Sequence, residues 1–103
     1  GHKLRGKASW YGEKWHGRLT ASGEVYDMYS MTAAHKTIPL GSRVLVKDIH
    51  TGKKVRVRIN NRGPYIEGRI IDLSKAAAKR LGILEKGITE VEIRILELPE
   101  IKE

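Results

Sequence analysis

Lys54-Val55-Arg56-Val57-Arg58-Ile59-Asn60, followed by Asn61-Arg62-Gly63-Pro64-Tyr65, is the stretch that decides how this chain folds. Apolar and charged residues alternate through its first half, which is the period of a strand with one buried face. The polar run and the Gly-Pro pair then end the strand in a loop. Loops at strand ends often carry binding and catalytic groups, because the rigid sheet holds them in place. We therefore expect a strand over residues 54–60 with a candidate functional loop directly after it.

The rest of the chain favours more short strands and one short helix. Strands are expected over residues 7–11, 43–47 and 91–95. A helix is expected over residues 75–81, because Ser74 can cap its start and Gly82 can end it. Many short strands, 11 glycines and one small helix favour an all-β barrel over a layered α/β sheet.

Length and composition restrict the protein classes. At 103 residues the chain is expected to form one domain over 1–103, with a core over about 7–96 and frayed ends. It has no apolar run near the ~18 residues of a membrane span and no visible signal peptide. Because it opens with Gly1-His2 rather than Met, we expect a processed or excised chain, which leaves room for an export signal that was removed. With no cysteine and no HxH or HExxH pattern, we expect neither a metal site nor a cofactor.

The net charge is +8, with a pI near 9.9. An excess of this size favours polyanionic partners, namely nucleic acid, anionic lipid or acidic polysaccharide. A solvated basic surface without a partner is the alternative interpretation of the same numbers.

Three side chains are candidates for acid–base chemistry. Asp72 follows an apolar segment that could bury it and perturb its pKa, but it could equally help to cap the helix beside Ser74. Glu24 lies in a polar, glycine-containing loop. His35 is interpreted as a partly buried structural histidine unless carboxylates converge on it.

The aromatic side chains are candidates for stacking on sugars or bases, or for core packing. Trp10 and Tyr11 are adjacent, so within a strand only one of the two can point inward. The full set is Trp10, Tyr11, Trp15, Tyr26, Tyr29 and Tyr65.

A series of short motifs in a fixed order resembles the core domain of the rare lipoprotein A (RlpA) family. The series covers about residues 7–96 and consists of Ala8-Ser9-Trp10-Tyr11-Gly12, His16-Gly17-Arg18, Thr20-Ala21-Ser22-Gly23-Glu24, Tyr26-Asp27-Met28, Thr32-Ala33-Ala34-His35-Lys36-Thr37, Pro39-Leu40-Gly41, Asn61-Arg62-Gly63-Pro64 and Gly68-Arg69-Ile70-Ile71-Asp72-Leu73-Ser74.

The resemblance implies a six-stranded double-psi β-barrel that acts on bacterial peptidoglycan. Family members are lytic transglycosylases that cleave between N-acetylmuramic acid and N-acetylglucosamine in peptide-stripped strands and leave a 1,6-anhydro end. Full-length members belong to the periplasmic cell envelope and are often lipid-anchored. These 103 residues include neither a cysteine for such an anchor nor a glycan-binding repeat, so the expectation for them does not include anchoring or septal targeting. We expect a monomer that binds glycan strands lacking stem peptides, and neither nucleic acid nor membrane.

The resemblance also implies site residues. The catalytic positions are Asn61, His35, Glu24 and Asp72. The substrate-binding positions are Trp10, Tyr11, Thr20, Tyr26, Arg62, Tyr65 and Arg69. Among these, Arg62 and Arg69 are the candidates for pairing with the free lactyl carboxylates of stripped glycan, since Arg binds carboxylates bidentately.

Position 61 departs from the family pattern, which has an aspartate there as the acid and base. Asn61 has almost the same size but no proton of useful acidity, and the loss of such a group typically costs about 10²–10⁴ in rate. Three explanations stay open: an engineered replacement, a natural homologue that binds without cutting, or an acid role for Asp72. We therefore expect a transglycosylase domain disabled at position 61, with a non-catalytic, expansin-like glycan-binding module as the alternative. A nucleic-acid-binding barrel fits the charge but leaves the motif series unexplained.

Overall fold

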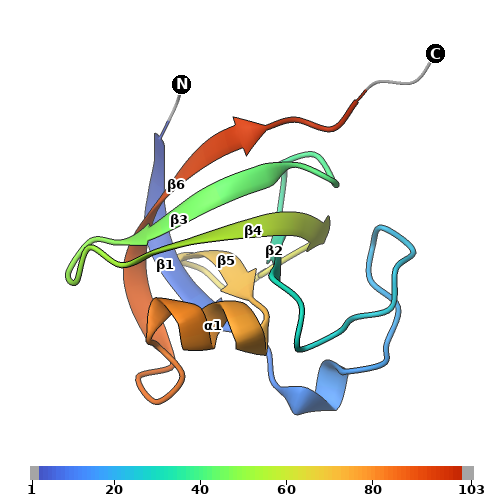
Figure 1. Ribbon diagram of the computed structural model, residues 1–103, viewed down its shortest axis with the longest axis horizontal. Coiled ribbons are helices and arrows are strands. Elements are labelled where there is room, and N and C mark those ends of the chain that lie inside the picture. The colour runs from blue at the N-terminus through green and yellow to red at the C-terminus, as the bar shows by residue number, and fades with distance from the viewer. Residues whose placement is uncertain (1–2, 101–103) are drawn as a thin grey trace.

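The computed structural model describes residues 3–100 and shows a closed six-stranded β-barrel with one short α-helix (Figure 1). The strands lie around the barrel in the order β1-β5-β2-β4-β3-β6. β1 pairs with β5 and β2 with β4 in parallel, whereas the other neighbours are antiparallel. The elements are β1 (Lys3–Trp10), the 3₁₀ turn η1 (Glu13–Trp15), β2 (Thr32–His35), β3 (Arg43–Asp48), β4 (Lys54–Asn61), β5 (Arg69–Leu73), α1 (Lys75–Leu81) and β6 (Ile88–Glu97).

The expected all-β barrel and its clearest elements are confirmed. Strands lie at 54–61, 43–48 and 88–97, with alternating burial through most of the first two, whereas in the third the alternation stops after Ile93 and Ile95 is exposed. β1 begins at Lys3 rather than at residue 7, so the barrel reaches further toward the N-terminus than expected, and it ends at Trp10. Leu98 is exposed, and the predicted frayed ends fall largely on residues 1–2 and 101–103, which lie outside the described residues.

Two strands and a turn have no signal of their own in the sequence. All four residues of β2 are buried, so no apolar–polar alternation marks it. β5 is five residues long and reads as a short apolar run. The turn η1 has no buried residue and is fixed by contacts with other segments.

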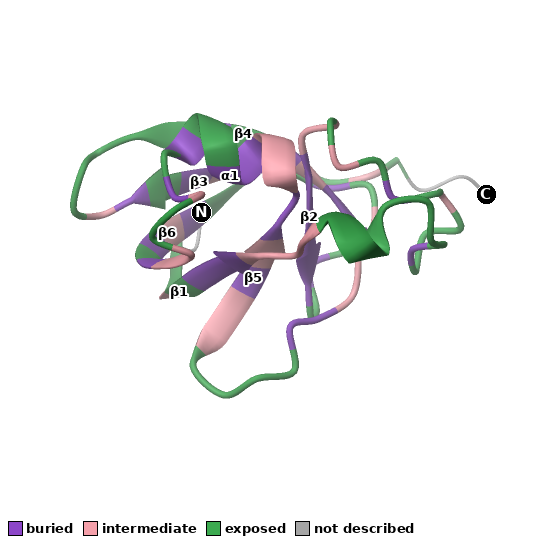
Figure 2. Cartoon of the chain, turned by 90° about the horizontal axis from the view of Figure 1, so that it is seen from below, coloured by how far each residue is buried: buried purple, intermediate pink, exposed green. Residues whose placement is uncertain are grey.

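The barrel interior is filled by aliphatic side chains from every strand. Figure 2 shows the buried positions along the strands in purple. Along β4, Val55, Val57 and Ile59 point inward, and α1 adds Ala77, Ala78 and Leu81. The other fully buried members are Ala8, Ala33, Ile38, Val44, Val46, Ile71, Leu73, Ile83, Val91 and Ile93. No helix of the described residues is long and apolar enough to cross a membrane.

Helix α1 begins and ends where its capping residues predict. The Ser74 hydroxyl accepts a hydrogen bond from the Ala77 N–H at 3.2 Å. Gly82 adopts the left-handed conformation at φ 84°, and its N–H donates to the carbonyls of Ala78 and Lys79.

A buried carboxylate closes the β3–β4 hairpin. Asp48 Oδ1 accepts from the backbone N–H groups of His50 and Thr51 at 2.8 and 3.2 Å. Its Oδ2 accepts from the Thr89 hydroxyl at 3.0 Å, which ties the hairpin to β6. Burial raises the pKa of Asp48, but the hydrogen bonds from His50, Thr51 and Thr89 outweigh it and hold the pKa below its usual range.

Asp48→Ala is expected to lower the free energy of unfolding by about 1–3 kcal/mol, because two backbone N–H groups and a buried hydroxyl lose their acceptor. Asp48→Asn should cost less, since its amide oxygen can still accept from the turn. The pKa of Asp48 is depressed in the folded state, so its contribution is present above about pH 4 and is lost as the pH falls through the folded-state value. Urea unfolding at neutral and acidic pH measures both effects. If acid lowered the free energy of unfolding of Asp48→Asn by as much as it lowers that of the parent, the loss in the parent would not come from protonation of Asp48.

Candidate active site

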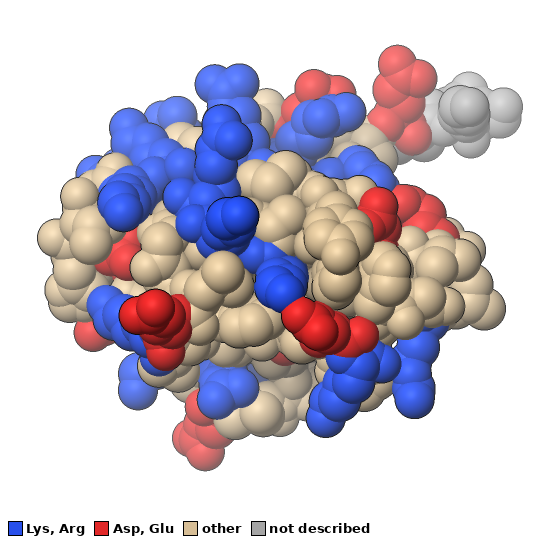
Figure 3. Space-filling view, turned by 60° about the horizontal axis from the view of Figure 1, so that its bottom comes forward, with Lys and Arg blue, Asp and Glu red and all other residues tan. Residues whose placement is uncertain are grey.

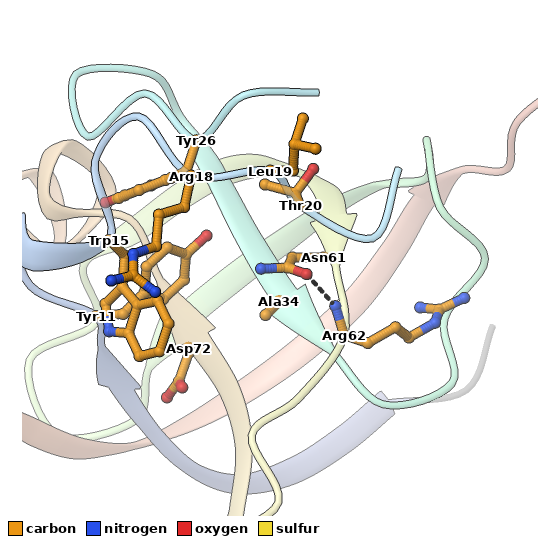
Figure 4. A pocket seen from close by; sticks show the side chains of 10 residues that line it. All are labelled: Tyr11, Trp15, Arg18, Leu19, Thr20, Tyr26, Ala34, Asn61, Arg62 and Asp72. Atoms are coloured by element: carbon orange, nitrogen blue, oxygen red, sulfur yellow. Dashed lines mark hydrogen bonds between the residues drawn. The ribbon is translucent and has the colours of Figure 1, made fainter. Parts of the chain in front are cut away.

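Four strands place one side chain each in a row across the outer face of the barrel. Ser9 on β1 lies opposite Asp72 on β5, and Asp72 lies opposite Ala34 on β2. Ala34 is in turn the partner of Asn61 on β4. Neighbouring strands are about 4.8 Å apart, so the backbones at Asp72 and Asn61 stand roughly 10 Å apart on either side of Ala34. Because the residue between them is only an alanine, a pocket opens over it (Figure 4).

A β-bulge turns Asn61 toward this pocket. The period of β4 sends every second side chain into the core up to Ile59, and the same period would send Asn61 inward as well. Ala33 pairs with Ile59, however, and Ala34 pairs with Asn61, so that Asn60 is an extra residue on β4. The bulge moves Asn61 to the face of Ala34, in keeping with the frequent use of bulges to re-aim side chains beside active sites.

The amide of Asn61 has a fixed orientation. Its Oδ1 accepts hydrogen bonds from the backbone N–H groups of Ala21 and Arg62, both at 2.9 Å. The side-chain nitrogen is therefore turned away from these donors and toward the pocket (Figure 4). An aspartate at this position would leave one oxygen on the same donors and present the other to a ligand.

Asp72 is a pocket residue rather than a helix cap. Its Oδ1 accepts a hydrogen bond from the Ser9 hydroxyl, and Ser9 itself is only 5% exposed. The capping hydrogen bond of α1 comes from Ser74 instead. Asp72 thus stands across the pocket from Asn61, held from behind by a buried hydroxyl.

The segment between β1 and β2 forms the wall of the pocket. Its turn η1 is tied to helix α1 by an ion pair between Glu13 and Lys75. The Arg18 guanidinium lies 5.3 Å from the centre of the Trp15 ring. The pocket encloses about 210 Å³, less than the roughly 300–1,000 Å³ of closed small-molecule sites, which suits one subsite of an open groove. It is lined by Tyr11, Trp15, Arg18, Leu19, Thr20, Tyr26, Ala34, Asn61, Arg62 and Asp72.

Two aromatic rings support the inner end of this wall. Tyr11 and Tyr26 pack with their ring centres 4.5 Å apart. Burial, reinforced by Tyr26, raises the pKa of Tyr11, so its phenol keeps its proton. Trp10 packs against the core and the adjacent Tyr11 lines the pocket, but β1 ends at Trp10, so the two residues do not share a strand as the prediction assumed.

Glu24 lies outside the pocket and holds the loop beside it. Its carboxylate makes a two-point ion pair with Arg58, with Arg58 Nη2 2.8 Å from Oε2. The hydrogen bonds from Arg58 hold the pKa of Glu24 below its usual range. Together with the hydrogen bond from Ser22 N–H to Asn60 O, this pair fastens residues 20–24 along β4. The same loop supplies Thr20 to the pocket and the Ala21 N–H to Asn61.

His35 is buried and organises the turn after β2. Its Nδ1 accepts from the backbone N–H groups of Thr37 and Ile38, both at 3.1 Å, so the ring proton is on Nε2. Burial, followed by the charges of Arg62 and Lys36, lowers the pKa of His35. The imidazole is not among the groups that line the pocket.

The other residues implied by the resemblance are only partly brought together. Tyr11, Thr20, Tyr26 and Arg62 line the pocket, whereas Trp10, Tyr65 and Arg69 do not. The guanidinium of Arg62 is engaged by the backbone, because its Nη1 donates to the carbonyls of His35 and Ile38 at 3.1 and 2.6 Å. Tyr65 is 76% exposed in the loop after β4.

Trp15, one of the aromatic candidates, lines the pocket, and four further residues of the site were not predicted to have a role in it: Ser9, Arg18, Leu19 and Ala34. All lie within or directly beside the motif series, but none is of a type that signals chemistry without its neighbours in space. Within residues 3–100, no group of three His, Asp or Glu side chains is placed to hold a metal ion.

The fold and the pocket, which we also call the cleft, define the class of protein. It is a double-psi β-barrel in which Asp72 and Asn61 lie on opposite sides of the cleft. A family model described as "Lytic transglycolase" matches residues 3–93. The chain belongs to this lytic transglycolase family.

Individual proteins agree with this assignment. The endolytic peptidoglycan transglycosylase RlpA of Vibrio cholerae is 57% identical over 91 residues, which are 88% of this chain and 35% of that protein. This chain thus spans about a third of the length of the curated relatives it matches. Among solved structures, a Streptomyces papain inhibitor superposes with a TM-score of 0.75 at 26% identity, covering 94% of this chain and 96% of that one. A mutant expansin of Clavibacter michiganensis in complex with cellohexaose, 19% identical, superposes with a TM-score of 0.73 over 98% of this chain and 54% of its own, and it shares the fold.

Proposed function

We propose that this chain is the catalytic barrel of an endolytic peptidoglycan transglycosylase, with turnover suppressed by the amide at position 61. The substrate is a glycan strand without stem peptides, cut between N-acetylmuramic acid and N-acetylglucosamine to leave a 1,6-anhydro end. The observation that carries the proposal is the placement of Asn61 and Asp72 on either side of Ala34, on a barrel 57% identical to a named enzyme of this activity.

The chemistry requires one group that first donates and then accepts a proton. An acid at position 61 would protonate the glycosidic oxygen as its bond to the anomeric carbon breaks. The 6-hydroxyl of the same sugar then attacks that carbon, and the conjugate base takes the hydroxyl proton. Atoms and charge balance without water, metal or cofactor. The amide nitrogen of Asn61 can donate a hydrogen bond to the glycosidic oxygen but cannot release a proton to it.

The charge of the cleft suits a glycan that carries carboxylates. Arg18 lines the pocket, and it has no ion pair with any carboxylate of residues 3–100. Arg62 is held by backbone carbonyls, so Arg18 is the better candidate for pairing with a lactyl carboxylate in the cleft. We further propose that the domain acts as a monomer in the cell envelope, without contacting nucleic acid or membrane.

A non-catalytic glycan-binding module is the second candidate, and the specific observation that favours it is Asn61 itself. An amide that is fixed by two backbone N–H groups can hold a glycan oxygen without cutting the strand.

Digestion of peptide-stripped glycan strands by the parent and by Asn61→Asp tests these candidates. New 1,6-anhydro ends from Asn61→Asp support the transglycosylase. Reducing ends without the anhydro bond would instead indicate hydrolysis, and tight binding by both proteins without new ends would support the binding module.

The ion pair between Glu24 and Arg58 should matter to this activity through the position of its loop. In the Asn61→Asp background, Glu24→Gln and Arg58→Gln are each expected to lower kcat/KM by about 10- to 100-fold. Without the ion pair, loop 20–24 would shift, and small displacements of groups that position the substrate cost this much in rate. The exchange Glu24→Arg with Arg58→Glu should recover part of the loss. If Glu24 instead acted on the substrate directly, moving its carboxylate to position 58 would not recover activity. A positioning role is therefore contradicted if the exchanged protein is no more active than either single variant.

A further inference from the structure

The β3–β4 hairpin carries an unusual arrangement of charge on its outer face. Arg43 lies directly opposite Arg58, and Lys47 lies directly opposite Lys54. Like charges that face each other across two strands destabilise a sheet. Two such pairs in one hairpin, with Arg56 between them on β4, place five cations side by side. We call Arg43, Lys47, Lys54, Arg56 and Arg58 the hairpin basic face.

Nearby carboxylates neutralise only part of this face. Glu24 pairs with Arg58, and Glu92, which lies opposite Lys47, makes its ion pairs with Lys3 and Arg5. Glu97 lies opposite Arg43 on β6, yet no ion pair joins it to any cation of residues 3–100. The space-filling view shows Lys and Arg side chains gathered in a band on one side of the molecule, with few carboxylates inside it (Figure 3).

The basic face is hollowed beside its arginines. A depression of about 390 Å³ is lined by Arg43, Arg56 and Arg58 together with one carboxylate, that of Glu97, and its remaining lining residues, which include Ser30 and Thr32, are uncharged. Arg43 and Arg56 make no ion pair with a carboxylate of residues 3–100, so their planar guanidinium groups suit two-point recognition of a ligand carboxylate, whereas both Nη atoms of Arg58 are already paired with Glu24.

This hollow and the cleft share one surface of the barrel. Thr32 pairs with Arg58, and Ala34 pairs with Asn61 on the same two strands. Two residues along β2 correspond to about 7 Å, so an extended polymer is long enough to reach both places. Loop 20–24 follows β4 between them, fastened to Asn61 at one end and to Arg58 at the other.

We propose that the hairpin basic face is a second glycan-binding surface, which holds the carboxylates of an anionic glycan strand outside the cleft. Its ligand rests on the proposed function, because peptide-stripped glycan is the carboxylate polymer that the cleft would take. The evidence for the surface itself is independent of that function, because it comes from the register of β3 and β4, which places Arg43 beside Arg58 and Lys47 beside Lys54. It gives the domain affinity for long strands that its small cleft alone does not provide.

Binding of long peptide-stripped strands to the Asn61 parent, measured by calorimetry at low and at physiological salt, tests the surface without cleavage. Arg43→Gln with Arg56→Gln removes two cations and leaves the ion pair between Arg58 and Glu24 in place. We expect about 2- to 30-fold weaker binding at low salt, the range for two exposed charge contacts, and a shallower salt dependence. The matched control is Lys7→Gln with Lys86→Gln, which removes the same charge near β1, across the barrel from β4, and should have little effect. Thermal unfolding of both double variants checks that each remains folded.

Three results would overturn the proposal. Equal weakening by both double variants would mean that net charge, not this face, attracts the strand. If strands whose carboxylates have been amidated bound as tightly as unmodified strands, the face would not be recognising carboxylates. If single-stranded DNA bound as tightly as glycan, and the double variant Arg43→Gln with Arg56→Gln lost this binding, the face would bind polyanions of any kind.

Failure of this inference differs from failure of the proposed function. In the Asn61→Asp background, glycans too short to leave the cleft should be cut equally well with or without Arg43→Gln and Arg56→Gln, while long strands should be cut more slowly by the variant. Equal cutting of long strands overturns the second surface alone. No cutting of any strand by Asn61→Asp overturns the transglycosylase, and the binding measurements still decide whether the face holds glycan.

Discussion

Asn61→Asp is expected to raise the release of 1,6-anhydro ends from peptide-stripped glycan by about 10²–10⁴ over the parent, the range that a positioned acid contributes. The replacement needs no rearrangement, because one oxygen of the new carboxylate can keep the hydrogen bonds from Ala21 and Arg62 N–H that now hold Oδ1. The other oxygen takes the place of the amide nitrogen in the pocket. End-group analysis by mass spectrometry under initial-rate conditions measures the gain.

The pH dependence of the restored activity follows from the same two donors. Backbone N–H groups favour the ionised carboxylate, so they lower its pKa and reduce the protonated fraction at neutral pH. We therefore expect the rate of Asn61→Asp to rise as the medium becomes mildly acidic. A rate that instead rose with pH would indicate that position 61 acts mainly as a base.

Asp72 provides the control that separates the two pocket carboxylates. If position 61 carries the acid, Asp72→Asn in the parent should change nothing measurable, since there is little activity to lose. In the Asn61→Asp protein, Asp72→Asn should reduce the rate, because it removes the charge that faces the anomeric centre from β5 and disturbs the hydrogen bond to Ser9. Substantial activity in the parent that Asp72→Asn abolishes would assign the acid to Asp72.

Local signals were enough to predict the elements that depend on neighbours in sequence. The alternation of Val55, Val57 and Ile59 predicts β4, and Ser74 and Gly82 predict both ends of α1. These features arise from backbone hydrogen bonds and burial within a few residues, so they can be read without the partner strands.

The site depends on register, which a single strand does not reveal. The period of β4 would place Asn61 in the core, and only the pairing of β4 with β2 introduces the bulge at Asn60. Glu24 meets Arg58 across 34 positions of sequence, so its role as a loop anchor was not predictable from the polar loop that contains it. Ala34 has no chemistry of its own, and its importance appears only when Asn61 and Asp72 are found on its two sides.

Ala34→Leu is expected to lower kcat/KM of the Asn61→Asp protein by about 10²-fold, and to weaken glycan binding by the Asn61 parent, while the barrel stays folded. The Ala34 side chain lines the pocket and is not part of the core cluster, so the three added carbons take up part of its roughly 210 Å³ and displace the sugar from the acid. Ala34→Ser keeps the small volume and should retain most activity, which makes it the matched control. Thermal unfolding separates exclusion of the ligand from loss of structure, because Ala34→Leu should shift the midpoint little. Full activity of Ala34→Leu would mean that the scissile bond does not lie over β2, and the row of Ser9, Asp72, Ala34 and Asn61 would then not be the site of cleavage.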